Sequence, residues 1–236
     1  MINNLWVIMP VYNEEKSIIH VLNEWNKVLI NSKLNYTICV LNDGSTDNTL
    51  NLLDQLKNSI NNLEIINKQN SGHGQTCIFG YKYAIKEGAD WILQLDSDGQ
   101  CDVSFLNTFI NNVTNDSENL FGNRKSRDDG FNRVIISKFV SIFTFLSTGF
   151  WIKDGNVPYR LMSAKELLKI INRVPEDFHL ANILVSVLLK KESKIIWIPI
   201  HFNKRFAGNP SVKSFSFIKH GVKLFKQLNQ SIKNNV

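Results

Sequence analysis

The sequence predicts an α/β fold built around a doubly wound, mostly parallel sheet, and two observations carry this prediction. Short apolar runs, typical of strands buried on both faces, alternate with segments of helical periodicity over the first hundred residues. Polar turns follow four of these units at the strand ends. Parallel sheets bind ligands at the carboxyl ends of their strands, so we expect the four turns to converge on one nucleotide-sized site.

The apolar run at residues 5–11 predicts the first strand, and Pro10 is expected to stop this strand before the end of the run. Asn13 is the expected N-cap of the next helix, whose apolar face includes Ile18, Leu22 and Trp25. The later units repeat this order, with strands at 36–41, 63–66 and 91–93, turns at 42–47 and 69–75, and helices at 48–56 and 76–86.

The fourth strand ends in Asp96-Ser97-Asp98-Gly99-Gln100. Two carboxylates one residue apart at a strand tip, followed by a glycine that permits a sharp turn, are hard oxygen ligands that suit Mg²⁺ or Mn²⁺. Such an ion keeps coordination positions open for phosphate oxygens. The motif therefore predicts a metal and diphosphate site, although an acidic turn that caps its own backbone has the same composition.

Four motifs together resemble the ordered motifs of family 2 glycosyltransferases, which have the GT-A fold: residues 9–15 (MPVYNEE), 41–47 (LNDGSTD), 70–74 (NSGHG) and 96–100 (DSDGQ). The second half carries weaker features that resemble the polyprenyl-phosphate sugar transferase branch, of the dolichyl-phosphate mannose synthase type. These features are residues 122–124 (GNR), 148–149 (TG), 154–155 (DG) and 199–205 (PIHFNKR), continuing to Ser211.

The resemblance implies a site for a UDP- or GDP-sugar. Base, ribose and diphosphate would contact Pro10, Tyr12, Glu14, Asp43, Ser45, Gly72, Asp96, Ser97 and Asp98. It also implies that Asp96, Asp98 and Gln100 hold the metal. The family commonly has two consecutive aspartates where this chain has Asn42 and Asp43, which leaves the choice of base open. His73 is interpreted as an ordinary loop residue more readily than as a substrate contact.

We expect one GT-A domain with a nucleotide-sugar-binding half at residues 1–122 and a C-terminal acceptor lobe at residues 123–236. Guanidinium groups pair bidentately with phosphate, so Arg124, Arg133 and Arg205 are the predicted contacts of an acceptor phosphate. Surface salt bridges are the alternative role for each of them.

Two segments of the second half bear on contact with a membrane surface. Residues 139–152 are apolar, but a bilayer span needs roughly 20 such residues, so this helix is either buried in the acceptor lobe or lies in the membrane interface. From Ser214 onward the spacing predicts a basic amphipathic helix, with Phe225 on its apolar side. The net charge of +6 lies largely in this half and favours anionic lipid over nucleic acid, for which no recognition motif is present.

The three cysteines have no metal-binding spacing and suit a reducing interior. No secretory signal precedes the first strand, so a cytoplasmic protein in peripheral contact with the membrane is predicted.

The leading hypothesis is an inverting, metal-dependent transfer of a sugar to polyprenyl phosphate. Its rival is transfer to a saccharide hydroxyl, which requires a carboxylate base. Asp177 is the first candidate for that base, with helix capping as its alternative role, and Asp154 is the second. A third hypothesis is a subunit that binds nucleotide-sugar without catalysis.

Overall fold

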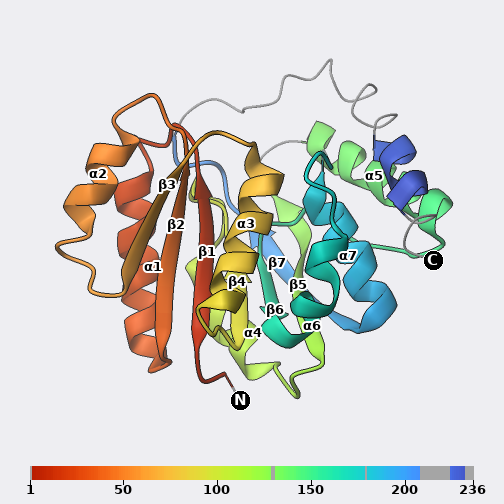
Figure 1. Cartoon of the computed structure of the whole chain (residues 1–236), viewed down its shortest axis with the longest axis horizontal. Coiled ribbons are helices and arrows are strands. Elements are labelled where there is room, and N and C mark those ends of the chain that lie inside the picture. The colour runs from red at the N-terminus through yellow and green to blue at the C-terminus, as the bar shows by residue number, and fades with distance from the viewer. Residues whose placement is uncertain (1, 129–130, 179, 208–223, 232–236) are drawn as a thin grey trace.

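The computed structural model describes residues 2–128, 131–178, 180–207 and 224–231 (Figure 1). Over these residues one seven-stranded sheet runs in the order β3-β2-β1-β4-β6-β5-β7. Helices cover both of its faces, with α3, α6 and α7 on the face turned toward the viewer in Figure 1 and α1 behind the sheet. The predicted α/β, doubly wound, mostly parallel architecture is confirmed.

The first half of the chain forms four parallel strands, β1 (Leu5–Val11), β2 (Tyr36–Asp43), β3 (Leu63–Lys68) and β4 (Trp91–Gln94). Helices α1 (Ile18–Ser32) and α2 (Thr49–Leu56) connect the first three strands. Helix α3 (His73–Lys86) returns the chain from β3 at one edge to β4 on the far side of β1. This reversal brings the turns after β1, β2 and β4 to one edge of the sheet.

The second half adds β5 (Glu118–Arg127), β6 (Arg160–Ser163) and β7 (Lys194–Phe202). Strand β6 is antiparallel to both of its neighbours, β4 and β5, and β7 pairs in parallel with β5. The helices of this half are α4 (Leu106–Asn111), α5 (Phe131–Thr148), α6 (Ala164–Ile170) and α7 (Ala181–Glu192). Two 3₁₀ turns occupy Val103–Phe105 and Ile171–Arg173, and residues 224–231 are also helical.

Gly80 of helix α3 faces the sheet at a point where no side chain would fit. A Cβ atom at this position would lie 2.5 Å from Leu41 Cδ1 and 2.6 Å from Ile8 Cγ2. A side chain larger than hydrogen would therefore push α3 away from β1 and β2. Because His73 begins the same helix, this packing also sets the position of the α3 N-terminus at the carboxyl edge of the sheet.

Two local predictions in the first unit are wrong. Strand β1 continues through Pro10 to Val11 and keeps its register with β2. Asn13 does not cap α1, which begins at Ile18 after Ser17. Asn13 has a left-handed backbone (φ 55°), and its Oδ1 accepts a hydrogen bond from the Thr46 backbone N–H at 2.8 Å. Its amide side chain thus joins two turns instead of ending a helix.

The predicted apolar helix at residues 139–152 is helical only as far as Thr148, the last residue of α5. Its large apolar side chains are mostly exposed, so the interpretation that buries them in the acceptor lobe is wrong for these side chains. None of the helices in the described ranges has the length and apolar content needed to span a bilayer.

The predicted basic C-terminal helix falls mostly at residues 208–223, outside the described residues. In the described part, 224–231, the side chains of Leu224 and Leu228 are buried and Phe225 is exposed.

Candidate active site

The turns after β1 and β2 are joined by reciprocal hydrogen bonds. The backbone N–H of Asn13 donates to Ser45 Oγ (3.0 Å), and that of Glu14 donates to Thr49 Oγ1 (2.9 Å). In the opposite direction, the Asn48 N–H donates to Glu15 Oε2 (3.0 Å). Side-chain oxygens that accept from backbone N–H groups fix loops that have no regular secondary structure. The two turns therefore form one rigid wall, which carries the predicted donor contacts Glu14 and Ser45.

The carboxylate of Asp43, at the end of β2, holds the turn that precedes α3. Its Oδ1 accepts from Lys68 Nζ (2.5 Å) and the Ser71 N–H (2.9 Å), and its Oδ2 accepts from the Gly72 N–H (3.0 Å). Burial alone would raise the pKa of Asp43, but these bonds outweigh it and lower the pKa below its ordinary value. Asp43 and Gly72, both predicted donor contacts, are thus brought into direct contact with each other.

The acid motif after β4 is tied to the ends of β1 and α1. Ser97 Oγ donates to the Pro10 carbonyl (3.0 Å), and Ser17 Oγ, which donates to Glu14 Oε2 (2.7 Å), lies 3.2 Å from the Ser97 carbonyl. Gly99 has φ 80°, and the Gln100 N–H returns to Asp98 Oδ1 at 3.0 Å. These bonds turn the chain sharply at the end of β4 and hold the predicted contacts Pro10, Ser97 and Asp98 together. Tyr12, the remaining predicted base contact, is exposed on the same turn as Asn13.

Carboxylates crowd this edge of the sheet. Burial and the nearby charge of Asp96 raise the pKa of Asp98 to about 6, against the opposing effects of the Gln100 N–H and Arg205. Burial also raises the pKa of Glu14, although a hydrogen bond from Ser17 and the charge of Arg205 favour its ionised form. Burial and mutual repulsion therefore disfavour the ionised forms of these carboxylates, and a nearby cation would stabilise those forms.

The acid motif fits a divalent cation in two respects. Asp96 Oδ1 is buried and accepts no hydrogen bond within the described part of the chain, and the negative charge of its carboxylate raises the pKa of Asp98. Oxygen donors of this kind match Mg²⁺ and Mn²⁺. No group of three or more His, Cys, Asp or Glu side chains that could hold a metal occurs in the described ranges. Gln100, the predicted third ligand, is buried, and its Nε2 donates to the Asn203 carbonyl (2.9 Å).

The segment after β7 closes over the acid motif. The Asn203 N–H donates to the Gln100 carbonyl (3.1 Å), and the Phe206 N–H donates to the Asp98 carbonyl (3.0 Å). Between them, Arg205 donates through Nη2 to Glu14 Oε1 and lies with Nη1 3.6 Å from Asp98 Oδ2. Arg205, predicted to contact an acceptor phosphate, is thus paired with two predicted donor-site carboxylates.

The other predicted acceptor arginine with a described side chain is in an ion pair. Arg124 on β5 donates to Asp154 through both Nε and Nη2, each at 2.6 Å, and its guanidinium lies 5.0 Å from the centre of the Phe202 ring. Asp154, the second candidate for a base, is therefore buried in a bidentate pair. Arg133 lies in α5, but its side chain is outside the part of the structure that is described.

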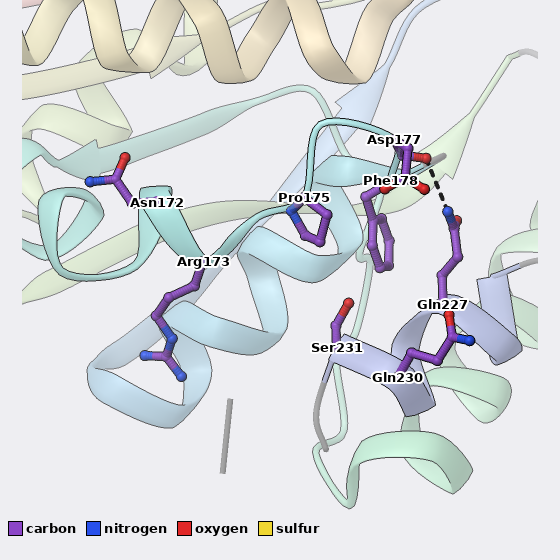
Figure 2. A pocket seen from close by; sticks show the side chains of 8 residues that line it. All are labelled: Asn172, Arg173, Pro175, Asp177, Phe178, Gln227, Gln230 and Ser231. Atoms are coloured by element: carbon purple, nitrogen blue, oxygen red, sulfur yellow. Dashed lines mark hydrogen bonds between the residues drawn. The ribbon is translucent and has the colours of Figure 1, made fainter. Parts of the chain in front are cut away.

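Asp177, the first candidate for a base, lies at a separate open pocket of about 460 Å³. Figure 2 shows this pocket between the segment around Pro175 and the C-terminal helical residues, with Gln227 Nε2 donating to the Asp177 carbonyl at 3.0 Å. Asp177 is exposed and does not cap α7, whose preceding residue is Leu180. None of the predicted donor residues lines this pocket.

Sequence reasoning undervalued two residues of the site. His73 begins α3, and its Nε2 lies 3.6 Å from Asp96 Oδ1. Lys68 was not singled out, yet it neutralises Asp43. The position of His73 between two glycines in a strand-to-helix turn was an available signal. A lysine at the end of a strand carries no comparable signal, because its long side chain usually lies in solvent.

The sheet order and the acid motif at its carboxyl edge define a doubly wound α/β protein, and comparison with known proteins gives the family. The model of the family "Glycosyl transferase family 2" matches residues 6–170, so this chain belongs to that family. Its architecture is the GT-A fold. The chain is 30% identical over 211 residues to the UDP-N-acetylglucosamine–dolichyl-phosphate N-acetylglucosaminyltransferase of Methanococcus voltae, covering 81% of each protein.

Two further proteins extend the comparison. The dolichol-phosphate mannosyltransferase of Pyrococcus furiosus is 27% identical over 231 residues, which cover 93% of this chain and 63% of that protein. The crystal structure of glucosyl-3-phosphoglycerate synthase from Mycobacterium tuberculosis, in complex with Mn²⁺ and UDP-glucose, matches 97% of this chain and 79% of its own. The TM-score is 0.67 at 12% identity, which is a likeness of fold.

Proposed function

We propose that this protein transfers a sugar from a UDP- or GDP-sugar to the phosphate of a polyprenyl lipid, with inversion at the anomeric carbon. The observation that carries the proposal is the pair Asp96 and Asp98 at the end of β4, with one buried carboxylate oxygen that accepts no hydrogen bond within the described residues. Relatives named as transferases acting on dolichyl, dolichol or undecaprenyl phosphate support the choice of acceptor.

In this proposal the donor lies along the joined turns after β1 and β2. Pro10, Tyr12, Asp43 and Ser45 contact the base and ribose, and Gly72 contacts the phosphates. Asp96, Asp98 and Gln100 would hold Mg²⁺ or Mn²⁺, which supplies positive charge beside the departing diphosphate. Glu14 accepts a hydrogen bond from Arg205 and keeps that guanidinium at the donor site.

The reaction is a single displacement. An oxygen of the lipid phosphate attacks the anomeric carbon, and the bond from that carbon to the nucleoside diphosphate breaks with its electron pair on the leaving oxygen. A phosphate is already ionised at neutral pH, so no side chain has to remove a proton. Arg124, Arg133 and Arg205 bind the acceptor phosphate, for which Arg124 exchanges its present partner Asp154.

The test is a screen of UDP- and GDP-sugars with Mn²⁺ and undecaprenyl phosphate, with oligosaccharide acceptors in parallel reactions. We expect a lipid-linked monosaccharide of inverted anomeric configuration, detected by mass spectrometry and NMR. Products found only on oligosaccharide hydroxyls would reject this proposal, and nucleotide binding without any transfer would favour a non-catalytic subunit.

The rival, transfer to a saccharide hydroxyl, is favoured by one contact. Gln75 of α3 donates to the carbonyls of Pro175 (3.1 Å) and Phe178 (3.3 Å), which holds the loop of Asp177 against the helix that begins at His73. Asp177→Asn should abolish turnover if Asp177 is a general base. The control is Glu176→Gln, at the exposed neighbouring position. Near-normal activity of Asp177→Asn on undecaprenyl phosphate is the result that our proposal expects.

A further inference from the structure

Helix α5 is amphipathic, but its orientation is the reverse of the usual one, in which a surface helix buries its apolar face. Between residues 139 and 146 its large apolar side chains are exposed to solvent, whereas the hydroxyl side chains of Ser141 and Thr144 are buried against the protein. Phe139 is 56% exposed and Leu146 is 67% exposed, whereas Ser141 is 3% and Thr144 is 1% exposed. We call the exposed set of Phe139, Ile142, Phe143, Phe145 and Leu146 the α5 outer face.

The buried hydroxyl groups are satisfied without water. Ser141 Oγ bonds to the Ser137 carbonyl (3.1 Å) and lies 3.4 Å from the Lys153 carbonyl, and Thr144 Oγ1 donates to the Val140 carbonyl (2.7 Å). Serine and threonine can donate in this way to the preceding turn of their own helix. Burying the hydroxyl face of α5 therefore leaves neither of these hydroxyl groups without a hydrogen bond. The α5 outer face, in contrast, exposes apolar side chains to water.

The apolar surface is continuous. Residues 139, 142, 143 and 146 recur at the spacing of one helical stripe. Trp151 packs edge-on against Phe145, and Phe225 of the C-terminal helical residues packs edge-on against Phe143, with ring centroids 5.9 and 6.4 Å apart. Figure 1 shows these helical residues beside α5, at the end of the molecule opposite α2. A contiguous exposed apolar surface of this kind marks an interaction site.

We propose that the α5 outer face, with Trp151 and Phe225, inserts into the interface of an anionic lipid bilayer with the helix axis along the membrane. The charge around it carries the choice of partner. Residues 131–153 contain Arg133, Lys138 and Lys153 and no acidic residue, and Lys138, Lys153 and Lys226 are exposed. Aromatic side chains beside lysines suit the boundary between acyl chains and anionic headgroups.

The charge of the whole second half also suits an anionic surface. It contains 20 of the 27 basic residues but only 7 of the 21 acidic residues, counted after residue 122. A second copy of this chain is a poorer partner, because a two-fold contact through the outer face would bring the lysines of both copies together.

The position of α5 would place the membrane near the proposed acceptor arginines, and in this respect the inference rests on the proposed function. Ser137 on α5 lies with its Oγ 3.5 Å from Asp154 Oδ1, and Asp154 holds Arg124. A bilayer against the α5 outer face would therefore present a lipid phosphate close to Arg124. The enzyme could then take its acceptor directly from the membrane surface.

The test is flotation of the full chain with vesicles of phosphatidylcholine, with and without phosphatidylglycerol, in the absence of nucleotide and polyprenyl phosphate. We expect binding to the anionic vesicles and a loss of about tenfold or more in the variant F139S/L146S. The control is I30S/L168S, because Ile30 (60% exposed) and Leu168 (57% exposed) are equally exposed on other helices. It should bind as the unchanged protein does.

Two measurements identify the mode of binding. K138E/K153E should remove the preference for anionic vesicles, and brominated lipid should quench a fluorescence component that W151F lacks. Absence of vesicle binding, or equal losses in F139S/L146S and its control, would overturn the inference. So would a dimer in solution that F139S/L146S dissociates. The D98N variant should float normally, which separates the failure of docking from the failure of catalysis.

Discussion

Arg205 and Asp98 lie opposite each other at the carboxyl edge of the sheet, with Nη1 of the arginine 3.6 Å from Oδ2 of the aspartate. The same guanidinium bonds to Glu14. One cation from the second half of the chain therefore compensates two carboxylates from the first half. It lies beside the acid motif, where the proposed divalent ion would supply the same kind of charge.

Arg205→Gln should therefore raise the affinity of the nucleotide-free protein for Mn²⁺. Removing a partly exposed cation from beside Asp98 removes repulsion, which we expect to tighten binding by about two- to fivefold. Titration of Mn²⁺ by electron paramagnetic resonance measures this directly. Lys204→Gln is the matched control, because Lys204 is exposed and is the preceding residue. Unchanged or weaker affinity in Arg205→Gln alone would show that Arg205 does not compete with the metal.

Asp98→Asn should abolish transfer but stabilise the metal-free protein above pH 6. The pKa of Asp98 is about 6 in the folded protein, against an ordinary value of 3.8 expected in the unfolded chain, so the folded protein binds this proton more tightly. The stability that the proton provides is complete below pH 3.8 and is lost as the pH rises through about 6. Asparagine has no proton to lose in this pH range, so the variant avoids this loss of stability.

Melting temperatures of both proteins in EDTA, at pH 5 and pH 7.5, test whether Asp98→Asn stabilises the protein as expected. We expect Asp98→Asn to gain about 1 to 3 kcal/mol over the unchanged protein at the higher pH, and less at the lower pH. Transfer activity should fall by at least about 100-fold. A variant that is less stable than the unchanged protein at pH 7.5 would contradict the assignment.

The convergence of the polar turns at one edge of the sheet was predictable because its determinants are local. An apolar run that ends in Asp96-Ser97-Asp98-Gly99 fixes both the strand and the polar turn, and parallel pairing of β1 with β2 and β4 then brings distant turns together. The contact of Arg205 with Glu14 was not predictable. It joins residues 191 positions apart, and it depends on how the segment after β7 crosses the sheet edge.

The orientation of α5 could not be read from its spacing. The apolar stripe through Phe139 and Leu146 and the hydroxyl stripe through Ser141 and Thr144 have the same helical period. Periodicity identifies two faces but does not say which one meets the protein. The hydroxyl face can be buried here because its donors are satisfied within the helix and by the Lys153 carbonyl. The helix itself was predictable, and its exposure was not.

Arg124→Lys should weaken the use of the lipid acceptor while sparing the donor. A lysine keeps the charge but cannot reproduce the fork that now reaches both oxygens of Asp154. We expect the KM for undecaprenyl phosphate to rise by about tenfold, with little change in the KM for the nucleotide-sugar. Lys125→Gln, at the exposed next position, is the control. Equal KM values for the lipid in Arg124→Lys and the unchanged protein would remove Arg124 from the acceptor site.

Gly99→Ala should disrupt the contact between the acid motif and the segment after β7. Gly99 has φ 80°, and an added Cβ would lie 3.0 Å from Phe206 Cβ. Phe206 has little freedom to move, because its N–H donates to the Asp98 carbonyl (3.0 Å) and its ring stacks on His20 with a centroid separation of 4.3 Å.

Gly88→Ala isolates this effect. Gly88 has φ 83°, but a Cβ atom there would meet nothing within 4 Å. Both variants bear the cost of a left-handed alanine, about 1 kcal/mol. Gly99→Ala should lose about 1 kcal/mol more and should also bind Mn²⁺ and nucleotide-sugar less tightly, because the backbone that carries Asp98 must shift. Urea unfolding and calorimetric titration measure both effects. Equal destabilisation with equal donor affinity in the two variants would mean that the segment after β7 does not set the geometry of the acid motif.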